Sequence, residues 1–268
     1  MPTLLLPRPA VFRPRFLAGR ILWRTGLCRH FEITTDLYRL RFFPTALSCA
    51  LWTDPRARQG DEDFYRRYLR RDDTVVDVGA NVGTLTLAAA ALVGARGAVF
   101  AIEAHPRTYR YLLENIALNG CENVSAVHAA AGDRRAVTFF SDGCLDDQNR
   151  VEEGGPLAVP KERLDDLVPA GRVQLLKIDV EGYELFVLRG AGTLLERTEC
   201  VYFECSEGAY RRYGYGVADV VSLLDKRGFT VWEKGVAGLS RFASAHGDHQ
   251  NLVAVRVGSN AVARLGLV

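Results

Sequence analysis

Acidic residues follow several short apolar runs, at positions where a carboxylate could bind a ligand or accept a proton. Asp77 lies in TVVDV, and Glu103 ends AVFAIE. Asp179 ends QLLKID, two residues before Glu181, and Glu204 lies within CVYFEC. A carboxylate accepts hydrogen bonds from hydroxyl groups and can act as a general base. These positions predict one site built from carboxylates, provided that the runs are strands of one sheet.

The apolar runs alternate with helical patterns along most of the chain. We expect strands at residues 74–78, 98–103, 124–130, 136–140, 174–180, 200–205, 230–234 and 251–257. We expect helices at residues 62–71, 83–93, 106–120, 183–190 and 217–228, and a polar surface loop at residues 141–155. This alternation predicts an α/β fold with a mainly parallel sheet and helices on both faces. Such sheets bind ligands beyond the carboxyl ends of their strands, where the acidic residues lie.

The turn after the first of these strands, Gly79-Ala80-Asn81-Val82-Gly83, differs from a dinucleotide fingerprint. In that fingerprint, G-x-G-x-x-G, the central glycine lets the backbone approach a pyrophosphate. Asn81 occupies that place here, which argues against a bound pyrophosphate. S-adenosylmethionine has a ribose and an adenine but no phosphate. Glu103 is placed to bind the ribose hydroxyls and Asp77 to lie near the methionine ammonium, unless both acids only cap the turns that follow them.

The chain also contains four segments in a characteristic order: VVDVGANVGTLTL, AIEAHP, NVSAVHAAAGD and LLKIDVEGYELFVLRGA. In this order they resemble the FkbM family of S-adenosylmethionine-dependent methyltransferases, over about residues 61–257. The resemblance implies a class I methyltransferase fold, with a Rossmann-like seven-stranded sheet whose last strand is antiparallel. It also implies transfer of a methyl group, usually to a hydroxyl oxygen of a natural product or sugar.

The resemblance further implies which residues bind S-adenosylmethionine. The family's cofactor turn corresponds to residues 77–83, its ribose-binding acid to Glu103, and the segment beside the adenine to residues 130–133. The predicted cofactor-binding residues are Asp77, Gly79, Asn81, Gly83, Glu103, Ala104, His105, Ala130, Ala131 and Asp133. The first sixty residues lie outside the resemblance, and they could decide the choice of substrate.

Methyl transfer to an alcohol needs a base near the methyl group, because the hydroxyl must lose its proton. We predict that Asp179, Glu181 or Glu204 is this base, since they lie at the ends of neighbouring strands. Asp179 could instead cap the next helix, and Glu204 could pair with an arginine. Two carboxylates alone are weak evidence for magnesium, and we predict no metal.

Two further segments are weaker candidates for the site. His246 and His249 precede the last strand, where a histidine could act as a base near neutral pH, although loop histidines are more often solvated. The segment YRRYGYG, residues 210–216, could form part of a substrate lid that binds an acidic or sugar-bearing molecule. It could equally be a basic and aromatic surface turn.

Composition and charge exclude several classes of protein. A net charge of +2 and a hydrophobic fraction of 48% describe an ordinary globular protein and argue against a nucleic-acid partner. The six cysteines contain no CxxC pair, so we expect thiols rather than disulfides or a zinc site. No run approaches the roughly 20 apolar residues of a membrane-spanning helix, and no secretory signal is evident. We therefore expect a cytoplasmic protein.

We divide the chain into a basic N-terminal extension at residues 1–60, a methyltransferase domain at residues 61–258 and a C-terminal tail at residues 259–268. The extension is expected to be helical, and to pack on the core or cover the substrate site. The predicted function is S-adenosylmethionine-dependent methylation of a hydroxyl on a small molecule, natural product or sugar, with a small-molecule or glycoside acceptor as partner. The alternatives are a methyltransferase-like domain that binds without catalysis and, in another enzyme class, a dinucleotide-dependent oxidoreductase.

Overall fold

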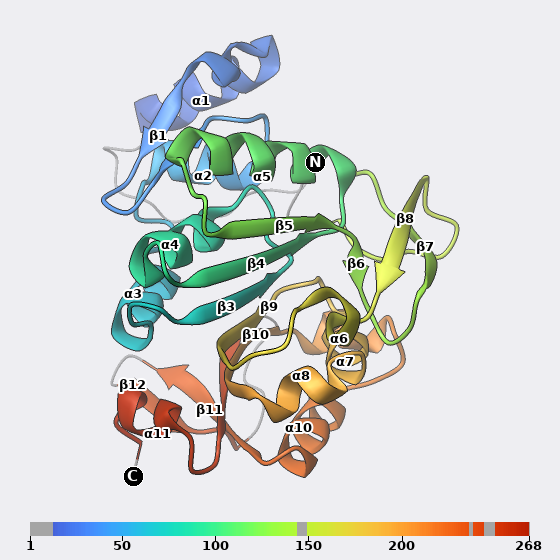
Figure 1. Cartoon of the computed structure of the whole chain (residues 1–268). Coiled ribbons are helices and arrows are strands. Elements are labelled where there is room, and N and C mark those ends of the chain that lie inside the picture. Colours follow the sequence, from blue (N-terminus) through green and yellow to red (C-terminus); the bar gives the residue numbers. More distant parts are fainter. Residues whose placement is uncertain (1–12, 144–148, 236–237, 244–249, 268) are drawn as a thin grey trace.

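The central sheet has the predicted mostly parallel arrangement. The computed structural model describes residues 13–143, 149–235, 238–243 and 250–267. The strands of this sheet are β3 (Thr74–Val78), β4 (Ala98–Glu103), β5 (Val124–His128), β9 (Val173–Ile178), β10 (Thr198–Cys205), β11 (Phe229–Gly235), β12 (Gly238–Arg241) and β13 (Gln250–Arg256). They lie in the order β12-β11-β13-β10-β9-β3-β4-β5 (Figure 1). Neighbouring strands from β10 to β5 are parallel, and β13 is antiparallel to both β10 and β11. The α/β fold and the antiparallel last strand are therefore confirmed.

The sheet has one strand more than the seven that we expected. The additional strand, β12, pairs antiparallel with β11 at the edge, with Trp232 opposite Arg241. Its sequence, GLSR, is only four residues long and carries too few apolar residues to show an alternating pattern. The expected number of seven strands is therefore wrong, because it did not include this edge strand.

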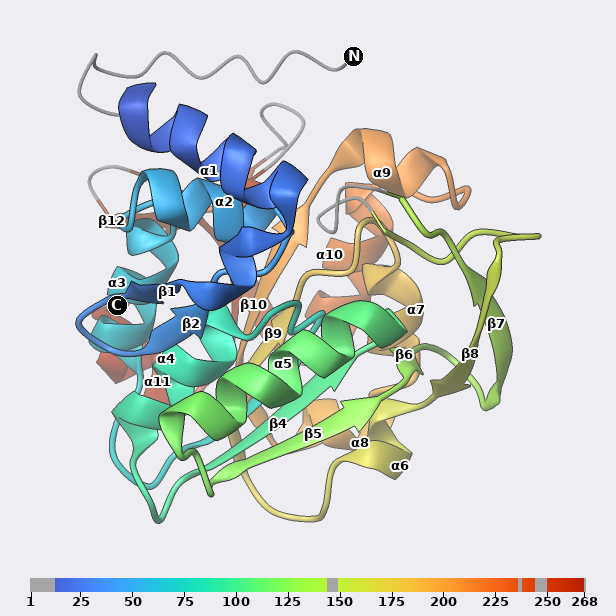
Figure 2. The same ribbon diagram turned by 90° about the horizontal axis from the view of Figure 1, so that it is seen from above.

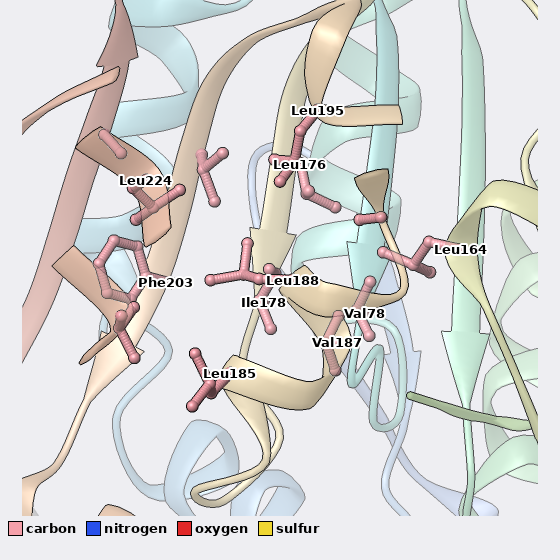
Figure 3. Close-up of a cluster of buried hydrophobic side chains, with 14 of the residues drawn as sticks. Val78, Leu164, Leu176, Ile178, Leu185, Val187, Leu188, Leu195, Phe203 and Leu224 are labelled. Carbon is pink, nitrogen blue, oxygen red and sulfur yellow. The ribbon is translucent and has the colours of Figure 1, made fainter. Parts of the chain in front are cut away.

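Helices cover both faces of the sheet, because alternate residues of its buried strands point to opposite sides. One face of the sheet is covered by α3 (Gln59–Tyr68), α4 (Thr84–Val93), α5 (Pro106–Asn119) and α11 (Asn260–Leu265). The other face is covered by α7 (Glu184–Arg189), α8 (Gly192–Glu196) and α10 (Val217–Lys226). Val76 and Leu176 pack in the hydrophobic cluster against α7, α8 and α10, part of which Figure 3 shows. Their neighbours Val75 and Leu175 pack in the cluster on the opposite face.

A second, three-stranded sheet lies beside the central one. It consists of β6 (Ala130–Ala131), β7 (Ala136–Phe140) and β8 (Leu157–Glu162), in the order β6-β8-β7. The expected strand at residues 124–130 is therefore divided, and its last residue belongs to another sheet. β8 was not predicted, because Pro160 lies within it and proline is typical of strand edges and turns. The short helix α6 (Leu164–Leu167) follows β8.

The segment before α3 packs against the helices α4 and α5, which cover one face of the central sheet (Figure 2). It forms α1 (Arg13–Thr25), the 3₁₀ helix η2 (Leu27–His30), β1 (Glu32–Thr34), β2 (Arg39–Arg41) and α2 (Ala46–Thr53). Leu40 and Leu51 are fully buried in the same cluster as Leu87 of α4. The N-terminal extension thus contains a small hairpin as well as helices, and it shares a core with the remainder of the described chain. At the other end of the chain, Arg264 of α11 pairs with the buried Asp73.

None of the helices in the described ranges has the length and apolar character that a membrane span requires.

Candidate active site

One cavity of about 1440 Å³ lies beyond the carboxyl ends of the central parallel strands. Its lining comes from the turns after β3, β4 and β9, from β6, and from α1 and α2 on the side of the N-terminal segment. The predicted site residues that line it are Gly79, Asn81, Glu103, Ala104, His105, Ala130, Ala131, Asp179, Glu181 and Glu204. Asp77, Gly83 and Asp133 do not line it. The structure therefore brings the predicted cofactor-binding and catalytic residues together in one cavity, apart from these three.

The glycine turn after β3 is shaped by its contact with the turn after β9. Gly79 has φ 75°, and a Cβ atom built on it would lie 1.9 Å from the carbonyl oxygen of Asp179. Asn81 also has a positive φ, 52°, and its Oδ1 accepts a hydrogen bond from the Val82 amide at 2.6 Å. Asparagine tolerates this conformation better than most residues do. Glycine is thus needed at position 79 because two turns of the site meet there.

The carboxylate of Glu103 is held at the floor of this turn and is 7% exposed. Its Oε2 accepts a hydrogen bond from the Asn81 amide and its Oε1 from the His105 amide, both at 2.8 Å. Burial raises the pKa of Glu103 to about 7, although these two amides and Lys177 act in the opposite direction. An ionised carboxylate has about four acceptor positions, so each oxygen can accept one further hydrogen bond. This donor set fits the two adjacent hydroxyls of a ribose.

Asp77 is fully buried and contacts a lysine that lines the cavity. Its Oδ1 lies 3.0 Å from Nζ of Lys177, and its Oδ2 accepts a hydrogen bond from the Thr86 hydroxyl at 2.5 Å. Lys177 lines the cavity and donates to the carbonyl oxygen of Gly79 at 2.7 Å. Asp77 therefore compensates a buried cation that holds the glycine turn.

Gly83 and Asp133, the other predicted residues outside the lining, also have structural contacts. A Cβ atom on Gly83 would lie 2.8 Å from Cδ1 of Leu112 in α5, so this glycine lets α4 and α5 approach. Oδ1 of Asp133 lies 3.1 Å from Nζ of Lys161. Burial works against ionisation of Asp133, but Lys161 and Arg134 outweigh it and lower the pKa of this carboxyl.

Asp179, Glu181 and Glu204 form a cluster at the carboxyl ends of β9 and β10, two and three strands away from β4, which ends in Glu103. One carboxylate oxygen from each lies within 4.8 Å of the others. They meet because β9 and β10 are parallel neighbours whose carboxyl ends share one edge of the sheet. Such a trio could accept a proton or hold a divalent cation, and acidic groups often cluster without a cation.

The backbone of this acidic cluster is fixed by buried polar groups. The Tyr215 hydroxyl donates to the carbonyl oxygen of Gly182 at 2.6 Å, and the Tyr210 hydroxyl donates to that of Glu204 at 2.7 Å. Glu184 accepts a hydrogen bond from the Val180 amide at 3.0 Å, and burial raises the pKa of its carboxyl to about 8. Tyr210 and Tyr215 thus support the acidic cluster from within the core. Asp179 does not cap α7, whose N-cap is Tyr183.

Two cationic side chains approach Asp179. Its Oδ2 lies 3.7 Å from Nζ of Lys177 and 3.9 Å from Nη2 of Arg58. Burial alone would lower the pKa of Arg58, but Asp61 and Asp179 outweigh it and raise that pKa. Sequence reasoning missed both cations, because neither belongs to a recognisable pattern: Lys177 sits inside a strand and Arg58 precedes a helix. The candidate bases His246 and His249 lie outside the described residues.

Comparisons with known proteins agree with this geometry. The family model for the Methyltransferase FkbM domain matches residues 77–231, which include the glycine turn and the acidic cluster. The chain is 29% identical over 160 residues to the hexuronic acid methyltransferase AglP of Haloferax volcanii, a match that covers 57% of this chain and 65% of the relative. It is 29% identical over 146 residues to methyltransferase 1 of Beauveria bassiana, covering 44% of this chain and 58% of that protein. The chain thus spans somewhat less than two thirds of the length of these curated relatives.

A solved structure of the FkbM methyltransferase from Methylobacillus flagellatus is 13% identical, with a TM-score of 0.46, over 89% of this chain and 59% of that one. The methyltransferases of the matched family use S-adenosylmethionine, so the predicted cofactor is confirmed, and Glu103 supplies acceptors that fit its ribose. Because the family model covers more than half of the chain, this protein belongs to the FkbM methyltransferase-domain family.

Proposed function

We propose that this protein transfers the methyl group of S-adenosylmethionine to a hydroxyl oxygen of a small molecule or sugar. The observation that carries the proposal is the presence, in one cavity, of a ribose-type carboxylate at Glu103 and of a cluster of three carboxylates on strands further along the sheet. We call the region around Glu103 the cofactor end and the region around the cluster the acceptor end. The printed name of the relative from Haloferax volcanii, a hexuronic acid methyltransferase, supports a sugar as the acceptor.

The residues of this chain have distinct parts in the proposed reaction. Glu103 accepts the ribose hydroxyls, and Ala130 and Ala131 give an apolar wall for the adenine. When bound, S-adenosylmethionine supplies a methyl group on a positively charged sulfur. Asp179 accepts the proton of the acceptor hydroxyl, while the hydroxyl oxygen forms a bond to the methyl carbon and the carbon–sulfur bond breaks. S-adenosylhomocysteine then leaves as the second product.

Lys177 and Arg58 orient the base in this scheme. Both lie within 4 Å of the same oxygen of Asp179, which leaves its other oxygen to face the acceptor. Alignment of the nucleophile with the carbon–sulfur bond and exclusion of water supply much of the remaining acceleration in such a displacement.

Titration calorimetry with S-adenosylmethionine and with NADH tests this function. We expect binding of S-adenosylmethionine alone, because Asn81 replaces the glycine that a pyrophosphate requires. A panel of hydroxylated sugars and alcohols is then incubated with methyl-labelled cofactor, and the products are identified by mass spectrometry. Absence of cofactor binding would refute the proposal, and binding without transfer to any hydroxyl in the panel would favour a non-catalytic binding domain.

A further inference from the structure

Five arginines of the described residues line the cavity, and one of them, Arg58, lies beside Asp179. The five are Arg20 and Arg24 of α1, Arg58 before α3, Arg150 before β8 and Arg212 after α9 (Glu207–Arg211). They come from four separate parts of the chain, and only the tertiary structure brings them to one cavity.

For three of these arginines, the described residues provide no acidic partner. Arg58 contacts Asp61 and Asp179, and Nη2 of Arg150 lies 3.6 Å from Oε1 of Glu152. For the remaining three, no carboxylate lies within 4 Å among the residues that the structure describes; these are Arg20, Arg24 and Arg212. Their side chains are exposed, so a ligand that enters the cavity can reach them.

Arg211, the neighbour of Arg212, is paired with a carboxylate. Nε of Arg211 lies 3.5 Å from Oε1 of Glu207, one turn earlier in α9, and Arg211 does not line the cavity. Of these two arginines, the one that lines the cavity is thus the one with no carboxylate within 4 Å among the residues that the structure describes. Unpaired guanidinium groups on a concave surface raise the local concentration of anions, and each can hold a carboxylate or phosphate through two parallel hydrogen bonds.

The acidic cluster restricts where an anion can bind. An anionic group beside Asp179, Glu181 and Glu204 would meet three carboxylates, although Lys177 and Arg58 each lie within 4 Å of Asp179. A neutral hydroxyl has no such penalty there. The two kinds of charge in the cavity therefore favour an acceptor whose hydroxyl meets the acids and whose anionic group meets the arginines.

We propose, on the basis of the methyl transfer proposed above, that the acceptor is an anionic hydroxyl compound. Its carboxylate or phosphate binds Arg24 and Arg212, with Arg20 beside them, and its hydroxyl faces Asp179. The aromatic rings of Phe16 and Trp23, which also line the cavity, offer apolar surface to the body of the acceptor. The product is an ether, because the anionic group is held away from the methyl group.

Two matched pairs of probes test this assignment on protein saturated with S-adenosylhomocysteine. 4-Nitrophenyl β-glucuronide and 4-nitrophenyl β-glucoside differ by a carboxylate, and glucose 6-phosphate and glucose differ by a phosphate. We expect calorimetry to show binding at least about tenfold tighter for the anionic member of one pair, and that pair identifies the anion. Double substitution Arg24→Gln and Arg212→Gln should abolish this preference and leave the affinity for S-adenosylhomocysteine within about threefold.

The control is Arg211→Gln, which removes a neighbouring positive charge outside the cavity and should leave the preference unchanged. Equal binding of both members in both pairs would overturn the proposal, as would a preference that persists in the double variant, or anionic probes that do not bind while S-adenosylhomocysteine does. A methylated product that mild alkali cleaves would be an ester and would also overturn it. If the wild-type protein bound neither S-adenosylmethionine nor S-adenosylhomocysteine, the proposed function itself would fail, and the anionic acceptor with it.

Discussion

The two ends of the cavity are built in different ways. At the cofactor end, the site depends on backbone geometry: a turn with positive φ at Gly79 and Asn81, and amides that hold the buried Glu103. At the acceptor end, it depends on long charged side chains, several of them exposed. The cofactor end lies within the residues that match the family model, whereas Arg20, Arg24 and Arg58 precede them. Asp179 and Arg212 of the acceptor end also lie within that match. We propose that the N-terminal arginines adapt the cavity to its acceptor.

The largest expected effect separates chemistry from cofactor binding. Asp179→Asn removes the proton acceptor but keeps the shape of the side chain, so we expect kcat to fall by about 10²–10⁴-fold. The affinity for S-adenosylmethionine should stay within about threefold, because the proposed ribose-binding residue, Glu103, is unchanged. Steady-state kinetics and calorimetry measure the two quantities. Asp166→Asn, an exposed substitution outside the cavity, is the matched control. Unchanged turnover in Asp179→Asn would remove Asp179 from the mechanism.

The next effect tests whether the cofactor end depends on backbone contact. Gly79→Ala would place a methyl group 1.9 Å from the carbonyl oxygen of Asp179, so we expect a loss of about 4 kcal/mol of stability and a fall of about 10 °C in Tm. Gly120→Ala is the control, because Gly120 also has a positive φ, 60°, but no atom lies within 4 Å of its added Cβ. The control should lose only about 1 kcal/mol. Similar losses in both variants would show that positive φ, and not the contact, makes Gly79 necessary.

The smallest effect is a pH dependence at the cofactor end. Burial raises the pKa of Glu103 to about 7, so the carboxylate that accepts two ribose hydroxyls is mostly present at pH 8 and mostly protonated at pH 6. We expect S-adenosylmethionine to bind about tenfold more weakly at pH 6 than at pH 8. Glu103→Gln should bind more weakly at both pH values and lose this part of the dependence. The amino group of the cofactor titrates equally with both proteins, so the difference between them reports on Glu103, and parallel pH profiles would contradict the assignment.

Local sequence patterns predicted the elements that carry the cofactor end. Pro106 and Gly120 bound α5 as expected, and Asp77 to Gly83 form the strand end and turn that the spacing indicated. The patterns could not show that Asp77 faces the core. Strand residues alternate between two faces, and in a strand buried on both sides the sequence does not distinguish them.

The acceptor end was predicted only in part, because its residues come from distant segments. The acids at strand ends were found, since parallel strands end at a common edge. Arg58 and Lys177 were not, because a single charged residue looks the same whether it faces solvent or a cavity. Residues 210–216 were interpreted either as part of a substrate lid or as a surface turn, whereas the hydroxyls of Tyr215 and Tyr210 support the backbone at Gly182 and Glu204.

The sequence by itself determined the α/β fold, the cofactor class and most of the carboxylates of the site. These follow from hydrophobic periodicity and turn residues, which are local properties of the chain. The tertiary structure alone decided which charges meet in the cavity: Asp77 with Lys177, Asp179 with Arg58, and three arginines with no acidic partner among the described residues. Ion pairing and burial depend on how separate elements pack, because electrostatic interactions act over a few ångströms in space and not along the sequence.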